Sequence, residues 1–315
     1  MPVESSTSSP VSRWKIILAL GTIYIVWGST FLAIRVGVQS MPPFFLAASR
    51  FLCAGVLLYL WGLFTTRERP TKRHWVNASI IGLLLLVSGN GVVVWVAQRL
   101  PSGLTALIIS TVPLWMVCLP AFFSRNQRPR ARTVVGLALG LGGVSILIPP
   151  PEGNFWSGAS GDCVLLVLAS LSWAIGTLFS KRAELPRSGA LSAGMEMMTG
   201  GLQLALLSAL TGEWEGVHIR HISTAAWIGL AYLIIFGSVI AFSAYRWLTP
   251  RISTARLATY AYVNPVVAVL LGRVFLAEPL SSRLVIGAIV ILSGVVLISL
   301  PHPRPTLKTP DTAAV

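Results

Sequence analysis

Two charged residues, Arg50 and Glu196, stand about seven residues inside long apolar stretches of this sequence. Arg50 falls within an apolar run over residues 44–64, and Glu196 falls within a run over residues 190–211. An ionised side chain inside a bilayer is costly unless it is paired or solvated, so such residues commonly mark substrate paths or proton relays. We expect Arg50 and Glu196 to line an aqueous path, to bind substrate charge or, at Glu196, to cycle a proton. The structural alternative is that each side chain pairs with a neighbour or extends toward the membrane surface.

Polar and aromatic residues also recur inside the apolar runs. A pocket for a metabolite needs a few placed polar groups, because apolar walls alone cannot orient a solute. Asn90 and Asn264 are the strongest of these candidates, since an amide is costly to bury without a partner. The structural alternative is that Ser and Thr pack helices while Trp and Tyr anchor the membrane interface. Together with Arg50 and Glu196, the predicted substrate-binding residues are Trp27, Ser29, Thr30, Asn90, Trp95, Ser110, Trp115, Trp173, Thr177, Ser238, Tyr245, Tyr260 and Asn264.

Motifs for catalysis do not assemble in this sequence. Residues 158–161 read Gly-Ala-Ser-Gly and match the GxSG of intramembrane serine proteases, but a nucleophilic serine needs a base within reach. All four histidines lie outside the apolar runs, and the sequence has neither a GxxxxGK[ST] phosphate loop nor an HExxH motif. Cys53, Cys118 and Cys163 lack the paired spacing of a zinc site or a disulfide framework. We therefore expect no catalytic residues, no metal site, no cofactor and no enzymatic activity.

The composition predicts that membrane-spanning helices carry these residues. Of 315 residues, 54% are hydrophobic and 11% are charged, and the mean hydropathy is +0.76, whereas about 25% of a typical soluble domain is charged. A membrane span uses roughly 20 apolar residues to cross about 30 Å of hydrocarbon. The sequence therefore predicts an all-α polytopic membrane protein with ten transmembrane helices. The apolar runs cover residues 14–34, 44–64, 75–97, 103–123, 133–149, 161–180, 190–211, 225–247, 254–276 and 283–300.

The net charge of +14 comes from basic residues that collect between the apolar runs. With ten spans, 18 of the 24 Lys and Arg residues fall on one side of the membrane and 5 on the other, while Arg50 lies within a run. Basic residues are usually retained in cytoplasmic loops. The asymmetry therefore predicts that both termini are cytoplasmic, and it accounts for the charge without a nucleic-acid partner.

The two halves of the chain share a weak but ordered similarity. Trp27 and Trp173 are 146 residues apart, Asn90 and Ser238 are 148 apart, and matching glycines near the end of each half are 151 apart. Five is an odd number, so two related five-helix halves must cross the membrane in opposite directions, as inverted repeats. Transporters built this way commonly bind substrate near the midplane, at the interface of the repeats.

The predicted organisation has five parts. By the repeat, Arg50 and Glu196 occupy equivalent positions in the second helix of each half. Gly136 and Gly140 form a GxxxG pattern that suits close packing, either with another helix of the chain or with a second copy, so a monomer and a homodimer both remain open. The parts are a disordered N-terminus at 1–13, a five-helix repeat at 14–149, a linker at 150–160, a second five-helix repeat at 161–300 and a disordered C-terminus at 301–315.

A series of short motifs runs through both halves in order. They are Val26–Ile34 (VWGSTFLAI), Pro42-Pro43, Arg50-Phe51, Ser172–Ala174, Thr254–Arg256, Asn264–Val266, Glu278-Pro279 and Ile286-Gly287. Together they resemble the EamA family of the drug/metabolite transporter superfamily over about residues 15–300. The resemblance implies ten helices as two inverted EamA repeats in a bacterial plasma membrane, with export or exchange of amino acids, metabolites or drugs through a central cavity. The sequence departs from the family pattern at one position. The family often has Glu before the last helix of each half, and Glu278 occupies this place in the second half. In the first half, Gln127 or Arg128 stands there.

These features lead us to expect a secondary active transporter that exports or exchanges small metabolites, amino acids or drugs by alternating access. Its partners would be a small-molecule substrate and the lipid bilayer. One cationic and one anionic residue within the membrane would suit a zwitterion such as an amino acid. A passive channel and a non-transporting membrane scaffold are the alternatives, although nothing in the sequence indicates the rings of charge or the carbonyl filter of a channel.

Overall fold

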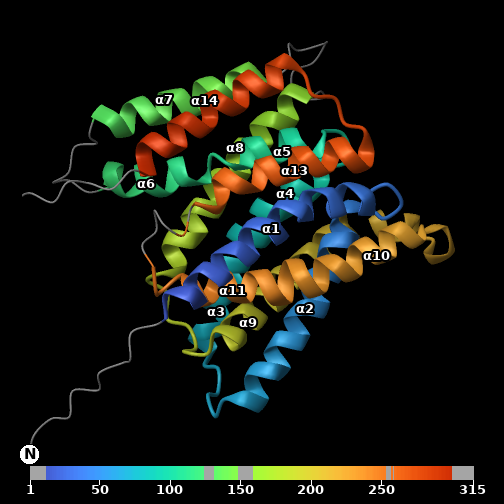
Figure 1. Cartoon of the computed structure of the whole chain (residues 1–315). Coiled ribbons are helices and arrows are strands. Elements are labelled where there is room, and N and C mark those ends of the chain that lie inside the picture. The colour runs from blue at the N-terminus through green and yellow to red at the C-terminus, as the bar shows by residue number, and fades with distance from the viewer. Residues whose placement is uncertain (1–11, 124–130, 148–158, 253–256, 258, 300–315) are drawn as a thin grey trace, which may run out of the picture.

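The computed structural model describes residues 12–123, 131–147, 159–252, 257 and 259–299. Over these residues the regular elements are all helices, which confirms the all-α class (Figure 1). Nearly all of the predicted disordered termini and of the predicted linker lie outside the described residues, although Arg13, placed in the N-terminal segment, begins the first helix. The helices are α1 (Arg13–Gly37), α2 (Pro43–Thr65), α3 (Lys72–Ile81), η1 (Gly82–Gly91), α4 (Val92–Val96), α5 (Ser102–Ile109), α6 (Val112–Phe123), α7 (Ala131–Leu147), α8 (Ala159–Ser180), α9 (Gly189–Leu210), η3 (Glu213–Gly216), η4 (Ile219–His221), α10 (Thr224–Tyr232), η5 (Leu233–Ile240), α11 (Ala241–Leu248), α13 (Tyr260–Leu276) and α14 (Ser282–Ser299).

Within the described part of the chain, six helical stretches are long and apolar enough to cross a membrane. Shorter apolar segments occur in α7, α13 and α14. The helical class is therefore established, whereas the count of ten spans in two inverted repeats stays a prediction. The six stretches are Arg13–Gly37, Pro43–Thr65, Lys72–Val96, Ser102–Pro120, Ala159–Ser180 and Thr224–Leu248.

Two of these stretches change to π-helical winding partway along. α3 continues through η1 into α4, and α10 continues through η5 into α11. A π-helical turn holds an extra residue and often occurs at a functional site. Asn90 lies in η1 and Ser238 lies in η5, so both changes of winding carry residues predicted to bind substrate.

α2 and α9 pack along each other with their backbones in close contact. A Cβ atom at Gly55 would lie 2.7 Å from the backbone nitrogen of Met198, and one at Gly62 would lie 2.9 Å from the Cα of Leu191. Only glycine fits such an approach, in the way small residues allow membrane helices to pack. The later residue of α2 meets the earlier residue of α9, so the two helices are antiparallel.

Two glutamates close this antiparallel pair, one at each end. Glu68, which follows α2, accepts hydrogen bonds from the backbone N–H groups of residues 187 and 188 at the start of α9, at 2.9 and 3.0 Å. Glu213, which follows α9, accepts from the N–H groups of residues 44 and 45 at the start of α2, at 3.2 and 2.9 Å. Each carboxylate satisfies donors that lack partners within their helix, and it meets the positive end of the helix dipole.

The GxxxG pattern of α7 packs against α14 of the same chain. A Cβ atom at Gly294 would lie 2.6 Å from the carbonyl oxygen of Gly136, and one at Gly143 would lie 2.8 Å from the backbone nitrogen of Ile291. Figure 1 shows α7 and α14 side by side at one edge of the molecule. The close packing that the pattern predicts therefore has a partner within the chain.

Candidate functional site

A cavity lies among helices from both halves of the chain. The cavity reaches the break between α5 and α6, where Ile109 and Val112 line it. Much of its wall is aromatic, with rings from Trp27, Phe31, Phe51, Trp173, Phe242 and Tyr260.

Arg50 brings a charge to this cavity from α2. Its side chain is 4% exposed, and it is the single formally charged residue among the described residues that line the cavity. Its Nε donates to the Oγ of Ser238 at 2.8 Å, and its guanidinium carbon lies 4.7 Å from the ring centre of Phe51. Its Nη1 is buried and has no hydrogen-bond partner. Arg50 is therefore held at one edge and keeps a free donor.

Two side-chain amides add polar groups to the wall. The Oδ1 of Asn90 on η1 is buried without a hydrogen-bond partner. With its amide oriented so that the nitrogen faces two carbonyl oxygens, Asn264 on α13 donates to Tyr24 at 3.0 Å and to Tyr260 at 3.1 Å. Asn264 therefore ties α1 to α13, whereas Asn90 retains an unused acceptor.

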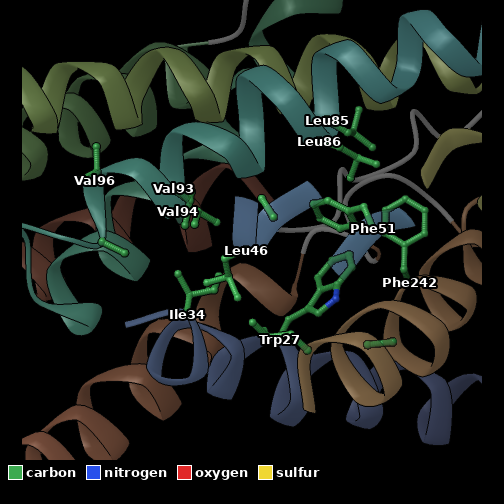
Figure 2. Packing of buried hydrophobic residues seen from close by; sticks show 14 of the residues in the cluster. Trp27, Ile34, Leu46, Phe51, Leu85, Leu86, Val93, Val94, Val96 and Phe242 are labelled. Carbon is green, nitrogen blue, oxygen red and sulfur yellow. The ribbon is translucent and has the colours of Figure 1, made fainter. Parts of the chain in front are cut away.

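Trp27 of α1 stands at the centre of the aromatic wall. Its ring centre lies 5.9 Å from that of Trp173, 5.2 Å from Tyr260 and 5.0 Å from Tyr245. Its Nε1 donates to the carbonyl oxygen of Gly237 at 3.1 Å. Figure 2 shows the indole pointing into the cluster of buried side chains, toward Phe242. Offset and edge-on contacts of this kind stabilise aromatic clusters and fix the orientation of the rings.

Glu196 does not line the cavity. It lies on α9, is 0% exposed, and has a carboxylate oxygen 3.3 Å from Nη2 of Arg246 on α11. The contact is ionic, because neither carboxylate oxygen has a partner in hydrogen-bonding geometry. Arg50 and Glu196 thus contact different partners, Ser238 and Arg246, and the structure places only Arg50 in the cavity wall.

The other predicted residues divide between the cavity wall and its surroundings. Ser238 and Tyr245 lie just behind the wall, against Arg50 and Trp27. Trp95 stacks on Phe44 at 5.3 Å, away from the cavity. Hydrogen bonds to other protein groups engage Ser29, Ser110, Trp115 and Thr177. Those that line the cavity, besides Arg50, are Trp27, Thr30, Asn90, Trp173, Tyr260 and Asn264.

Some residues of the site were missed from the sequence. Phe31, Phe51 and Phe242 line the cavity, but phenylalanine is common throughout an apolar sequence and gives no local signal. Arg246 is one of the 18 basic residues that the charge count places on the cytoplasmic side, but it lies in α11 and only 10% of its side chain is exposed. Its position at the end of the apolar run 225–247 was the available sign that it is buried.

A second ion pair lies at the edge of the helical bundle. Arg99, between α4 and α5, donates from Nε and Nη2 to the two carboxylate oxygens of Asp162 in the first turn of α8, both at 2.7 Å. The hydrogen bond to Asp162 raises the pKa of Arg99 above its ordinary value. A two-point contact of this kind fixes geometry as well as charge, so it joins the first half to the start of the second.

The chain is similar to known membrane proteins over most of its length. A family model described as EamA-like transporter family matches residues 13–148 and 160–300. The chain is 40% identical over 283 residues to the "Uncharacterized inner membrane transporter YedA" of Escherichia coli (strain K12), covering 90% of each chain. It is 28% identical over 293 residues to the "Probable amino-acid metabolite efflux pump" of Salmonella typhimurium, covering 90% of this chain and 94% of the relative. A solved structure described as "Crystal structure of protein" matches with a TM-score of 0.62 at 24% identity, over 91% of this chain and 96% of the other, and so shares its fold.

Proposed function

Since this chain belongs to the EamA-like transporter family, we propose that it is a secondary active transporter that exports or exchanges a small organic solute through the cavity around Arg50. That it is a membrane transporter rests on the family and on relatives described as transporters. The cavity carries the rest of the proposal, because its walls come from both halves of the chain and it holds a buried cation with an unused donor.

The proposal takes the ten spans as two inverted repeats. The antiparallel packing of α2 and α9 supports this, because equivalent helices of inverted repeats must run in opposite directions. The two glutamates support it further: Glu68 and Glu213 are 145 residues apart, and each caps the helix that the other one follows. The proposed spans are α1, α2, α3–η1–α4, α5–α6 and α7 in the first half, and α8, α9, α10–η5–α11, α13 and α14 in the second.

Contacts between the halves give a route to alternating access. α1 of the first half packs against α10, η5, α11 and α13 of the second, and α8 of the second half packs against η1, α5 and α6 of the first. The first helix of each half therefore packs against the other half. A rocking motion of one half against the other would expose the cavity between them to one side of the membrane at a time, as in other transporters with inverted repeats.

We place the protein in the plasma membrane of a bacterium with both termini in the cytoplasm. The description of a relative as an inner membrane transporter supports the location, and the distribution of basic residues, 18 against 5, supports the orientation. The description of another relative as an efflux pump supports export. A monomer suffices for this proposal, because the cavity is complete within one chain.

Counterflow in proteoliposomes tests the proposal. The full chain would be reconstituted, loaded with an unlabelled solute from a panel of amino acids, aromatic carboxylates and amines, and supplied with the same solute labelled outside. A carrier gives saturable uptake that is stimulated by the internal solute. Uptake that does not saturate and needs no internal solute would replace the carrier with a channel, and no uptake beyond that of empty liposomes for the whole panel would favour a scaffold.

A further inference from the structure

We infer that the cavity binds a solute with one anionic group, such as a carboxylate, on an apolar or aromatic body, in preference to a cation or a zwitterion. This inference rests on the proposed function, because it takes the cavity around Arg50 as the transport site. It replaces the sequence-based expectation of a zwitterion, which depended on Glu196 sharing the site with Arg50.

The charge balance of the cavity gives the first argument. No Asp or Glu is among the described residues that line it, and no salt bridge joins Arg50 to a carboxylate in the described part of the chain. Glu196 lies outside the wall and is paired with Arg246. A buried cation without a counter-ion is costly, so an anionic ligand would supply the charge that the protein leaves out.

The donors of Arg50 give the second argument. Ser238 accepts from Nε, while Nη1 is buried and unpartnered. A guanidinium has five N–H donors in a fixed planar fork, and a carboxylate or phosphate oxygen pair matches that fork. Phe51 packs against the guanidinium, and Gly237 leaves it room, since a Cβ atom there would lie 3.0 Å from Nη2. The cation is therefore oriented by the protein before a ligand arrives.

The remaining wall selects the body of the ligand and disfavours an ammonium group. Trp27, Trp173 and Tyr260 present aromatic surface, with three phenylalanine rings beside them. An ammonium group could contact an aromatic face, but in the same cavity it would lie close to the like charge of Arg50. Thr30 donates to the carbonyl oxygen of Trp27 at 2.6 Å, so its hydroxyl is already engaged. An anion with an apolar body matches both the charge of Arg50 and the aromatic wall of the cavity.

Four probes that share a phenylethyl body and differ in charge test this inference: 3-phenylpropionate, phenylalanine, phenethylamine and 3-phenylpropanol. Binding to the purified full chain would be measured by equilibrium dialysis with labelled probes. We expect the carboxylate to bind at least tenfold more tightly than the zwitterion or the amine. Tighter binding of either of those two, or no binding of the carboxylate at millimolar concentration, would overturn the inference.

Variants of Arg50 test whether this residue causes the preference for an anionic ligand. A hydrogen bond to a charged group accounts for roughly tenfold or more in affinity. Arg50→Gln should therefore weaken carboxylate binding at least tenfold and change alcohol binding by less than about twofold. Arg50→Lys keeps the charge but loses the planar fork, so it should weaken carboxylate binding less. Arg251→Gln, at an exposed arginine beyond α11, is the control and should leave both unchanged. Equal losses of carboxylate and alcohol binding in Arg50→Gln would overturn the role of Arg50. If Arg50→Gln does not fold, wild-type carboxylate binding in Arg50→Lys would overturn it.

Counterflow of the same probes separates this inference from the proposed function. A carboxylate that binds through Arg50 without being exchanged would contradict transport and support the ligand class. An amine that is exchanged with saturation would support transport and overturn the ligand class. Saturable exchange of the carboxylate, lost in Arg50→Gln, is the result that both predict.

Discussion

Nε of Arg50 on α2 donates a hydrogen bond to Oγ of Ser238 on η5, 2.8 Å away, across 188 residues of sequence. The preceding residue, Gly237, accepts the hydrogen bond of the Trp27 indole at 3.1 Å. Two consecutive residues of the π-helical segment η5 thus position both the cation of the cavity and the tryptophan at its centre. Any change at this point of η5 should alter the cavity before it alters the fold.

Removing the hydroxyl of Ser238 tests this relationship. Ser238→Ala leaves Nε of Arg50 without its acceptor and frees the guanidinium to turn. Because a hydrogen bond to a charged group is worth about 1.5–3 kcal/mol, we expect transport efficiency to fall roughly 10–100-fold. The measurement is counterflow, with Ser180→Ala as the control, since Ser180 is also buried but bonds only to the carbonyl of Thr177 within α8. Equal activity of the two variants would show that Ser238 does not position Arg50.

Adding a methyl group at Gly237 tests the room that Arg50 needs. A Cβ atom there would lie 2.9 Å from Cγ2 of Thr30 and 3.0 Å from Nη2 of Arg50. Gly237→Ala should therefore displace the guanidinium and reduce transport at least tenfold, as small misplacements at a binding site can. Gly21→Ala, where a Cβ atom would meet nothing within 4 Å, should leave transport unchanged. Wild-type counterflow in Gly237→Ala would contradict the close packing of η5 on Arg50.

The buried pair of Glu196 and Arg246 should act on stability. Breaking such a pair by removing one partner costs about 3–5 kcal/mol, because the other charge stays buried and unpaired. We expect Glu196→Leu and Arg246→Leu each to lower the midpoint of thermal unfolding of the purified chain. The double variant should lose less than the sum of the two single losses, because it leaves no unpaired charge. Additive losses would mean that the two charges do not interact.

The sequence predicted the helical class and much of the cavity wall. Apolar runs of membrane length left few other structures open. Arg50 and Asn90 stood out because a charge or an amide in an apolar run has to be satisfied. Both line the cavity with a polar atom that the protein leaves unpartnered. Residues that break the apolar pattern therefore gave the most reliable signal for the site.

The partners of the other polar residues could not be predicted, because they depend on how the helices face one another. Glu196 breaks the apolar pattern as strongly as Arg50, yet it faces Arg246 and not the cavity. The Ser110 hydroxyl donates to the carbonyl oxygen of Leu107 one turn earlier, and the Thr177 hydroxyl bonds to that of Tyr245 on α11. The caps made by Glu68 and Glu213 join residues more than 100 positions apart, and neither glutamate has a local motif. Helix rotation and packing, which set these contacts, leave no trace in the spacing of single residues.

Acid should weaken the cap that Glu68 makes on α9. Desolvation alone would raise the pKa of this carboxyl group, but the backbone hydrogen bonds of Arg187 and Ser188 and the charge of Arg187 lower it below its ordinary value of 4.5. A pKa that is lower in the folded state adds stability above the unfolded pKa, and the gain is lost as pH falls through the folded value. Glu68→Gln should therefore melt below the wild type at pH values above the ordinary pKa of 4.5, and the two melting temperatures should converge as the pH falls through the folded pKa. A difference in melting temperature that stays constant with pH would contradict the pKa shift.

The reciprocal caps also predict which loops lie on opposite sides of the membrane. α2 has 23 residues and is about 35 Å long at 1.5 Å per residue, so Glu68 and Glu213, at its two ends, should lie at opposite membrane faces. In a Cys53→Ala background, Arg69→Cys and Glu215→Cys place a thiol beside each glutamate, at positions that are exposed.

We expect a membrane-impermeant maleimide to label Glu215→Cys in intact cells and to label Arg69→Cys only after the membrane is opened. Labelling of both from the same side would overturn the inverted arrangement. Labelling of Arg69→Cys alone in intact cells would keep that arrangement and reverse the orientation, because the caps fix only the relative positions of the two loops and the basic residues decide which loop faces the cytoplasm.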